Sequence, residues 1–127
     1  MTRAYLAFTE KGLALAQKLA SALPGTVARC GHGGPSLADW AAEQFAHADA
    51  LIFVGAVGIA VRAIAPHCRS KAVDPAVVVL DECGHFAVPI LSGHLGGAND
   101  LARALAAACS AVPVITTATD ANGAFAV

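Results

Sequence analysis

The stretch ALIFVGAVGIAVRAIAP, residues 50–66, indicates the fold class of this chain. It opens with five apolar residues, which is typical of a strand that is covered on both faces within a parallel sheet. The turn Gly55–Gly58 then leads into a helix that we expect over Ile59–Ala65, and Pro66 stops that helix. A buried strand followed at once by a helix favours an α/β fold.

Strands and helices alternate along the rest of the chain. We expect Thr9 and Ser36 to cap two helices, and we expect Gly84 to adopt a positive φ in the turn of a β-hairpin. The expected strands are Arg3–Phe8, Thr26–Arg29, Ala50–Val54, Val77–Leu80, His85–Leu91 and Val112–Ile115, and the remaining helices are Glu10–Leu23, a helix after Ser36, and Gly97–Ala108. This pattern predicts an open, mostly parallel, Rossmann-like sheet with helices on both faces and one β-hairpin.

Length and composition exclude several classes of protein. The 127 residues suit one α/β domain over residues 1–127, and a chain that is 57% hydrophobic and 13% charged is not disordered. A net charge of −1 offers no basic surface for nucleic acid. The longest apolar run, Ala50–Val61, is too short to cross a bilayer, and the first residues lack a signal-peptide core. We therefore expect a cytoplasmic protein without membrane or nucleic-acid partners.

The cysteines and two of the histidines raise the question of a metal site. Cysteines stand at positions 30, 68, 83 and 109 without a C-x-x-C pair, so we interpret them as reduced thiols. His32 and the pair His67-Cys68 could be metal ligands, but their spacing matches no zinc pattern. We expect no metal site.

The direction of the hairpin strands decides which residues could share a ligand site. In α/β sheets, ligands bind outside the carboxyl ends of the parallel strands. We expect His85–Leu91 to run parallel to the neighbouring strands, so that Asp74 lies at the ligand edge and the turn at Asp81 and Glu82 lies about 20 Å away. The predicted ligand edge then collects Gly55–Gly58, Asp74, Ser92–Gly97 and Thr116–Asp120.

Two glycine turns, GAVG and SGHLGG, each join an expected strand to a helix. Small residues there expose the N–H groups of a helix's first turn, which attract anions, and Arg62 adds a positive charge near the first turn. The alternative is that the glycines only make tight turns and that Arg62 is a solvated side chain. Neither turn is a G-x-G-x-x-G fingerprint or a P-loop, so nothing supports a nucleotide site.

His94 is the most informative single residue in these turns. A histidine in a glycine-rich loop could act as a general base near neutral pH, or it could only fix the loop by a hydrogen bond. Ser92 does not stand in a G-x-S-x-G elbow, so a role in the turn explains it better than a role as nucleophile. Asp120 could orient a histidine or start a turn, and Asp74 before proline is a common turn residue.

Three segments together resemble a known family. ADALIFVGAVGIAVRAIAP, DPAVVVLDECGHFAVPILSGHLGGANDLAR and PVITTATDANGAFAV occur in the order and spacing found in the amino-terminal domain of cobalt-precorrin-5A hydrolases, the CbiG-type enzymes of cobalamin biosynthesis. The resemblance covers about residues 48–127. Family members usually continue into a middle and a carboxyl-terminal region. Family enzymes open the δ-lactone of a cobalt-bound tetrapyrrole and release acetaldehyde.

The resemblance implies roles for the residues of the predicted edge. Lactone opening needs a base for the water and donors for the oxyanion. It would use His94 as base, oriented by Asp120 or Asp74, with the Gly96 and Gly97 amides as donors. The predicted substrate-binding residues, which would hold the carboxylates of the macrocycle, are Gly55, Gly58, Arg62, Ser92, Gly96, Gly97, Asn99, Thr116 and Thr117. No cofactor is expected, because cobalt arrives within the substrate.

Two other functions stay open. The chain could be a non-catalytic corrinoid-binding module of a split or truncated enzyme, or a general anion-binding Rossmann-like domain. A broad macrocycle has more surface than one sheet edge can enclose, so a carboxyl-terminal partner domain or a homodimer would supply a second wall.

Overall fold

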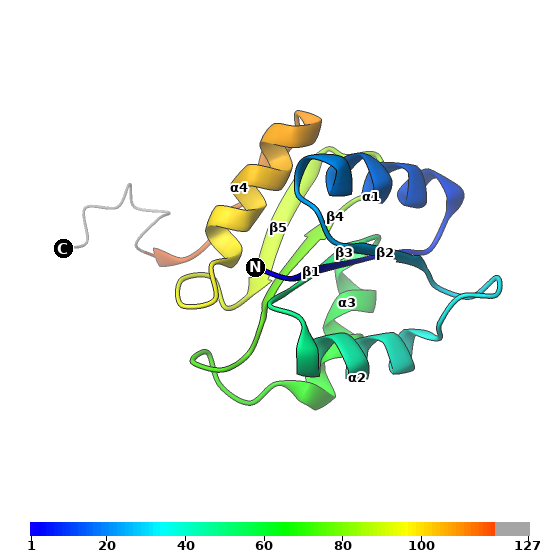
Figure 1. Ribbon diagram of the computed structural model, residues 1–127. Coiled ribbons are helices and arrows are strands. Elements are labelled where there is room, and N and C mark those ends of the chain that lie inside the picture. Colours follow the sequence, from blue (N-terminus) through cyan, green and yellow to red (C-terminus); the bar gives the residue numbers. More distant parts are fainter. Residues whose placement is uncertain (119–127) are drawn as a thin grey trace.

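A six-stranded sheet in the order β2-β1-β3-β4-β5-β6 forms the centre of the molecule, as the computed structural model shows for residues 1–118 (Figure 1). The elements are β1 (Arg3–Ala7), α1 (Glu10–Ala22), β2 (Thr26–Arg29), α2 (Leu37–His47), β3 (Ala50–Val54), α3 (Val57–Ile64), the 3₁₀ helix η1 (Ala65–His67), β4 (Ala76–Leu80), β5 (Phe86–Leu91), α4 (Ala98–Cys109) and β6 (Val112–Pro113). The predicted α/β class, with helices on both faces and one hairpin, is confirmed.

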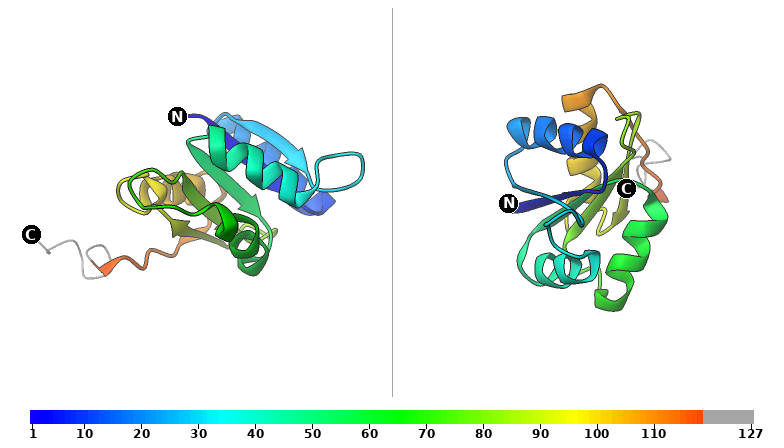
Figure 2. Two further views of the ribbon diagram at one scale, coloured as in Figure 1. Left: turned by 90° about the horizontal axis from the view of Figure 1, so that it is seen from below. Right: turned by 90° about the vertical axis from the view of Figure 1, so that its right-hand side faces the viewer.

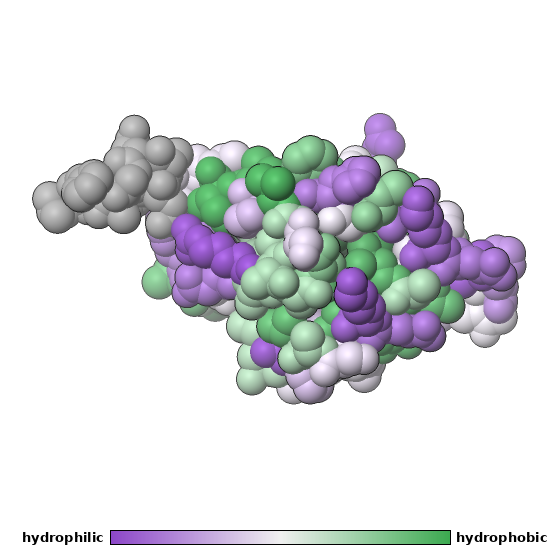
Figure 3. Space-filling view, turned by 90° about the horizontal axis from the view of Figure 1, so that it is seen from above, coloured by the Kyte–Doolittle hydropathy of each residue, from purple (hydrophilic) through white to green (hydrophobic). Residues whose placement is uncertain are grey.

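The helices form one layer on each face of the sheet (Figures 1 and 2). Helices α1 and α4 cover one face, where the core includes Tyr5, Ile52 and Leu105, and α2 and α3 cover the other, where Trp40 packs against Phe53. Seen from the side of α1 and α4, polar and apolar side chains are interspersed over the surface (Figure 3). Every residue of β3 and β4 is buried, because these strands are covered from both sides.

Sequence patterns that span a few residues predicted the helix caps and most element boundaries. The Thr9 hydroxyl accepts a hydrogen bond from the Gly12 N–H at 3.0 Å, and the Ser36 hydroxyl accepts one from the Asp39 N–H at 3.1 Å, so both predicted N-caps are confirmed. Gly84 has a φ of +71°, as expected. Helix α3 begins at Val57, two residues earlier than predicted, and β6 ends at Pro113 rather than at residue 115.

The predicted direction of the hairpin strands is wrong. Strand β4 runs parallel to β3, and β5 runs antiparallel to β4. The physical reason is the crossover through α3, which returns the chain to the edge where β3 started, so that β4 must run the same way. The carboxyl ends of β1, β3 and β4 therefore lie at one edge, which we call the carboxyl edge, and the opposite edge is the amino edge.

This reversal divides the predicted site between the two edges. The turn Gly55–Gly58 follows β3 at the carboxyl edge, together with Asp81 and Glu82 after β4. Asp74 precedes β4 and the loop Ser92–Gly97 follows β5, so both lie at the amino edge. Asp74 and the loop do share an edge away from Glu82, as expected, but Gly55–Gly58 is not on it. No helix within residues 1–118 is long and apolar enough to cross a membrane.

Candidate active site

A pocket of about 310 Å³ opens at the carboxyl edge, where the chain order of the strands reverses. Strand β1 connects to β2 on one side, whereas β3 connects to β4 on the other, so the reversal falls between β1 and β3. Ligands of open α/β sheets bind at this kind of position. The pocket is lined by residues that follow β1, β3 and β4, namely Phe8, Thr9, Val54, Gly55, Ala56, Ile59, Asp81 and Glu82.

Two hydrogen-bonded side chains form the polar rim of this pocket. The Thr9 hydroxyl donates to Oε2 of Glu82 while its oxygen accepts from the Gly12 N–H. Because the N-cap bond fixes the hydroxyl oxygen, Thr9 holds the half-buried Glu82 carboxylate in one position at the pocket. A carboxylate held in this way can accept a proton from a bound water.

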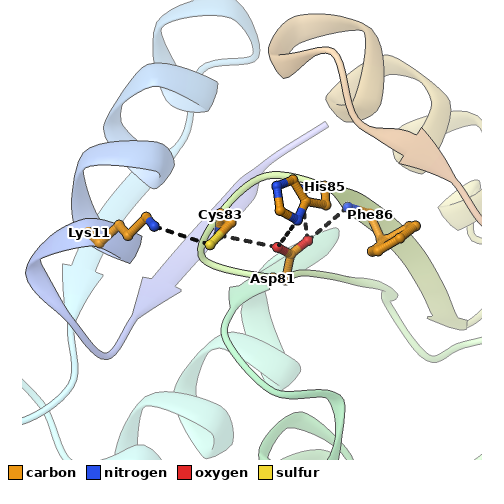
Figure 4. A network of polar contacts seen from close by, with 5 residues as sticks. All are labelled: Lys11, Asp81, Cys83, His85 and Phe86. Carbon is orange, nitrogen blue, oxygen red and sulfur yellow. Dashed lines mark hydrogen bonds and ion pairs between the residues drawn. The ribbon is translucent and has the colours of Figure 1, made fainter.

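Asp81 and Cys83, on either side of Glu82 in the sequence, make the polar contacts that hold the turn between β4 and β5; Figure 4 shows the contacts of Asp81 and Cys83. The Asp81 carboxylate accepts hydrogen bonds from the N–H groups of Cys83, His85 and Phe86 at 2.7–3.2 Å. The Lys11 ammonium donates to the Cys83 sulfur at 3.1 Å, and this bond raises the pKa of Lys11 from its usual value. Asp81 therefore shapes the turn, whereas the Glu82 carboxylate contacts Thr9.

The amino-terminal end of α3 forms the other wall of the pocket. A Cβ on Gly55 would lie 2.8 Å from the Phe8 ring, so glycine is required there for packing. A Cβ on Gly58 would meet no atom within 4 Å. Neither a side chain nor a loop carbonyl of residues 1–118 caps the first turn of α3. Arg62 is exposed one turn further along and forms no ion pair with any residue that the structure describes.

At the amino edge, the loop Ser92–Gly97 is closed by its own hydrogen bonds. The hydroxyl of Ser92, which is 9% exposed, donates to the Asp74 carbonyl oxygen at 3.0 Å. A Cβ on Gly96 would lie 2.5 Å from the Ser92 Cβ, so the chain passes too close for any side chain. These contacts agree with the turn role expected for Ser92 and account for Gly96 without a ligand.

The N–H groups at the start of α4 are largely used within this loop. The Gly97 N–H donates to the His94 carbonyl at 3.2 Å, and the N–H groups of Ala98 and Asn99 donate to the carbonyls of Ser92 and Gly93 at 3.0 Å. One of the two predicted oxyanion donors, the Gly97 amide, is therefore engaged. By contrast with α3, the first turn of α4 is capped by backbone carbonyls.

The other predicted residues lie in different surroundings. His94 and Thr116 are exposed, whereas Asn99 is buried and donates to the Thr117 hydroxyl at 3.0 Å, which brings the second and third family-like segments together. Both oxygens of the Asp74 carboxylate accept from the Arg69 N–H, at 2.9 and 3.1 Å, so the carboxylate closes the loop before β4. Asp120 lies outside the described residues.

Cys68 is an exposed residue, but partial desolvation of its thiol and, second, the nearby Asp74 charge raise the pKa of Cys68. No group of three or more His, Cys, Asp or Glu side chains in the described part of the chain is arranged to hold a metal ion.

Sequence reasoning missed the pocket residues Phe8, Thr9 and Glu82. It dismissed Glu82 as a turn residue because the hairpin was oriented the wrong way. A signal was present, since β3, α3 and β4 form a βαβ unit, and such a unit makes the two strands parallel. That rule alone would have placed Glu82 beside Gly55.

The fold and the pocket define a Rossmann-like α/β domain with a candidate ligand site at the carboxyl edge. The model of the family described as "Cobalamin synthesis G N-terminal" matches residues 39–120. The chain belongs to this family, as the resemblance of its three segments led us to expect.

Individual relatives agree with this assignment. The cobalt-precorrin-5A hydrolase of Salmonella typhimurium is 47% identical over 94% of this chain and 36% of that protein, and the enzyme of the same name from Priestia megaterium is 54% identical over 55% of this chain and 19% of that protein. A crystal structure from Sulfolobus solfataricus, described as a cobalamin biosynthesis protein G homolog, superposes with a TM-score of 0.76 at 27% identity, over 91% of this chain and 36% of that one. The chain thus spans about a third of the Salmonella and Sulfolobus proteins.

Proposed function

We propose that this chain is the amino-terminal domain of a cobalt-precorrin-5A hydrolase and acts in cobalamin biosynthesis. The reaction adds water to the δ-lactone of cobalt-precorrin-5A and releases acetaldehyde, giving cobalt-precorrin-5B. The 47% identity to the Salmonella hydrolase over nearly the whole chain carries this proposal. The cobalt ion enters as part of the substrate, so the domain needs no cofactor of its own.

The carboxyl edge offers contacts that suit such a substrate. A macrocycle rimmed with acetate and propionate groups presents both apolar surface and carboxylates. Val57, Ile59 and Val61 of α3 are 38–46% exposed, and Ile59 lines the pocket. Arg62 on the same helix supplies a cation for a carboxylate. A pocket of about 310 Å³ accepts one corner of a macrocycle, so a second domain or a second copy of the chain would cover the rest.

The test combines the chain with the remainder of a related enzyme. We would replace the matching segment of the Salmonella hydrolase with this chain, incubate the chimera with cobalt-precorrin-5A, and measure acetaldehyde together with the mass of the tetrapyrrole product. We expect acetaldehyde and product in equal amounts. A folded chimera that forms neither would disprove the hydrolase function.

The 127-residue chain alone separates catalysis from binding. We expect it to bind cobalt-precorrin-5A weakly, to lose that binding in high salt because carboxylate contacts dominate, and to turn over slowly or not at all. Binding by the chain, combined with a chimera that binds but is inactive, would instead support the non-catalytic corrinoid-binding module.

A further inference from the structure

We propose that the pocket at the carboxyl edge is the reaction site, and that Glu82 is the general base that activates the attacking water. This inference rests on the proposed function and assigns the role of base to a residue that the family resemblance did not indicate. It moves the expected base from His94, at the amino edge, to a carboxylate at the point where the strand order reverses.

The first argument is the position of Glu82. Its carboxylate lines a pocket whose other walls are mostly apolar, with Phe8, Val54 and Ile59 among them. The Thr9 hydroxyl is its hydrogen-bond partner among the described residues and contacts Oε2, so Oε1 is available to a water in the pocket. His94, by comparison, is an exposed side chain at the other edge of the sheet and does not line this pocket.

The second argument is the uncapped start of α3 across the same pocket. Ala56 and Ile59 line the pocket, and no side chain of residues 1–118 caps the first-turn N–H groups of this helix. Gly58 lies in this turn with open space where a side chain would stand. Glycine inside a helix is unfavourable compared with alanine, and no described contact requires it here. A ligand atom that approaches the backbone closely would explain why this position lacks a side chain.

These groups suffice for the lactone step. Oε1 of Glu82 takes a proton from water while the water oxygen bonds to the lactone carbonyl carbon, and the carbonyl electron pair moves to its oxygen. The N–H groups of α3 donate hydrogen bonds to this oxyanion. When the carbonyl re-forms, the ring C–O bond breaks and Glu82 returns the proton to the departing oxygen. One water is consumed, and a carboxyl group and a hydroxyl group result.

The decisive experiment compares Glu82→Gln with His94→Gln in the active Salmonella chimera. We expect Glu82→Gln to lower kcat at least 100-fold with little change in binding of cobalt-precorrin-5A, because a glutamine keeps the shape but accepts no proton. We expect His94→Gln to stay within a few-fold of the unaltered chimera. Glu43→Gln, on the outer side of α2, is the matched control and should change nothing.

A second variant tests the role of α3. Gly58→Ala should raise the melting temperature of the 127-residue chain, since alanine favours the helix and meets no neighbour. In the chimera it should nevertheless lower acetaldehyde release at least tenfold. A purely structural glycine would give the first effect without the second, which would overturn the α3 part of the proposal.

The outcomes separate this inference from the proposed function. If the chimera is active and Glu82→Gln retains its rate while His94→Gln loses it, the reaction stands and the base is at the amino edge. If kcat of the unaltered chimera falls at acid pH and His94→Gln removes this pH dependence, the base is likewise at the amino edge. If the unaltered chimera binds cobalt-precorrin-5A without turnover, both proposals fail.

Discussion

The hydroxyl of Ser92 donates a hydrogen bond to the carbonyl oxygen of Asp74 at 3.0 Å, and this buried contact joins the loop after β5 to the residue before β4. Ser92 adopts a φ of +58°, in the left-handed region, so the backbone itself is strained to make the contact. The loop Ser92–Gly97, which the sequence suggested as a catalytic loop, is therefore hydrogen-bonded to the segment that precedes β4.

Ser92→Ala should destabilise the fold by about 1 kcal/mol, because a buried carbonyl loses its hydrogen-bond partner. Urea unfolding of the 127-residue chain would measure this loss. Acetaldehyde release by the folded chimera should change little. A Ser92→Ala chimera that is fully folded but inactive would point to an acyl-enzyme route through the serine.

Gly96→Ala should be more damaging than Ser92→Ala. Its Cβ would lie 2.5 Å from the Ser92 Cβ and 3.0 Å from the Ser92 carbonyl oxygen, and the loop can relieve that overlap only by breaking its own hydrogen bonds. We expect a loss of about 2–3 kcal/mol in unfolding free energy, as for other overpacked sites. Gly58→Ala is the internal comparison, and an equal loss in both variants would contradict the packing argument.

The Cys68 thiol is exposed but should react slowly with iodoacetamide, because partial desolvation and the Asp74 carboxylate raise its pKa. Asp74→Asn removes the negative charge and keeps an acceptor for the Arg69 N–H, so it should increase the alkylation rate of Cys68 near pH 8. Peptide mass spectrometry would follow each cysteine separately. Cys83 lies at the opposite edge and should react at the same rate in both proteins.

Asp49 should contribute to stability in a pH-dependent manner. The backbone N–H and hydroxyl of Thr2 donate to its carboxylate at 2.7 and 3.0 Å, and these bonds lower its pKa from 3.8. A lowered folded-state pKa stabilises the fold above the unfolded pKa, and the effect is lost as the pH falls through the folded value.

Asp49→Asn should therefore destabilise the chain near pH 7, and the difference should shrink as the pH falls below 3.8 and through the lowered folded-state pKa of Asp49. Thr2→Val, which keeps the N–H donor, should show a smaller effect with the same pH dependence. Thermal unfolding across the pH range measures both. A difference that persists unchanged into strong acid would mean that Asp49 acts through packing and not through its charge.

Most element boundaries and caps could be predicted because their causes lie within a few residues. The Thr9 cap depends on an N–H three residues further on, and the positive φ of Gly84 depends on the turn itself. The contact between Asn99 and Thr117 also agrees with the prediction that their segments meet. Caps and turns depend on residues a few positions apart, so the sequence itself carries the pattern that predicts them.

The candidate site was harder to predict because it joins three distant segments. Thr9, Gly55 and Glu82 each look ordinary in their own surroundings: a cap, a tight turn and a hairpin turn. They become a pocket only when β1, β3 and β4 lie side by side with their carboxyl ends together. No residue close to Glu82 in the sequence indicates that Thr9 and Gly55 will be its neighbours.

By itself, the amino-acid sequence determined the α/β class, the caps and the family, since these follow from apolar periodicity, short-range hydrogen bonds and a run of matching residues. The packing of the strands in the tertiary structure decided that Gly55 lies beside Glu82 and not beside His94, a result that the βαβ pattern indicated but the residues around Glu82 did not. The physical reason is strand direction: the crossover through α3 sets β4 parallel to β3, and the tight turn at Gly84 then forces β5 to run the opposite way. These strand directions place the loop Ser92–Gly97 at the amino edge and Glu82 in the pocket.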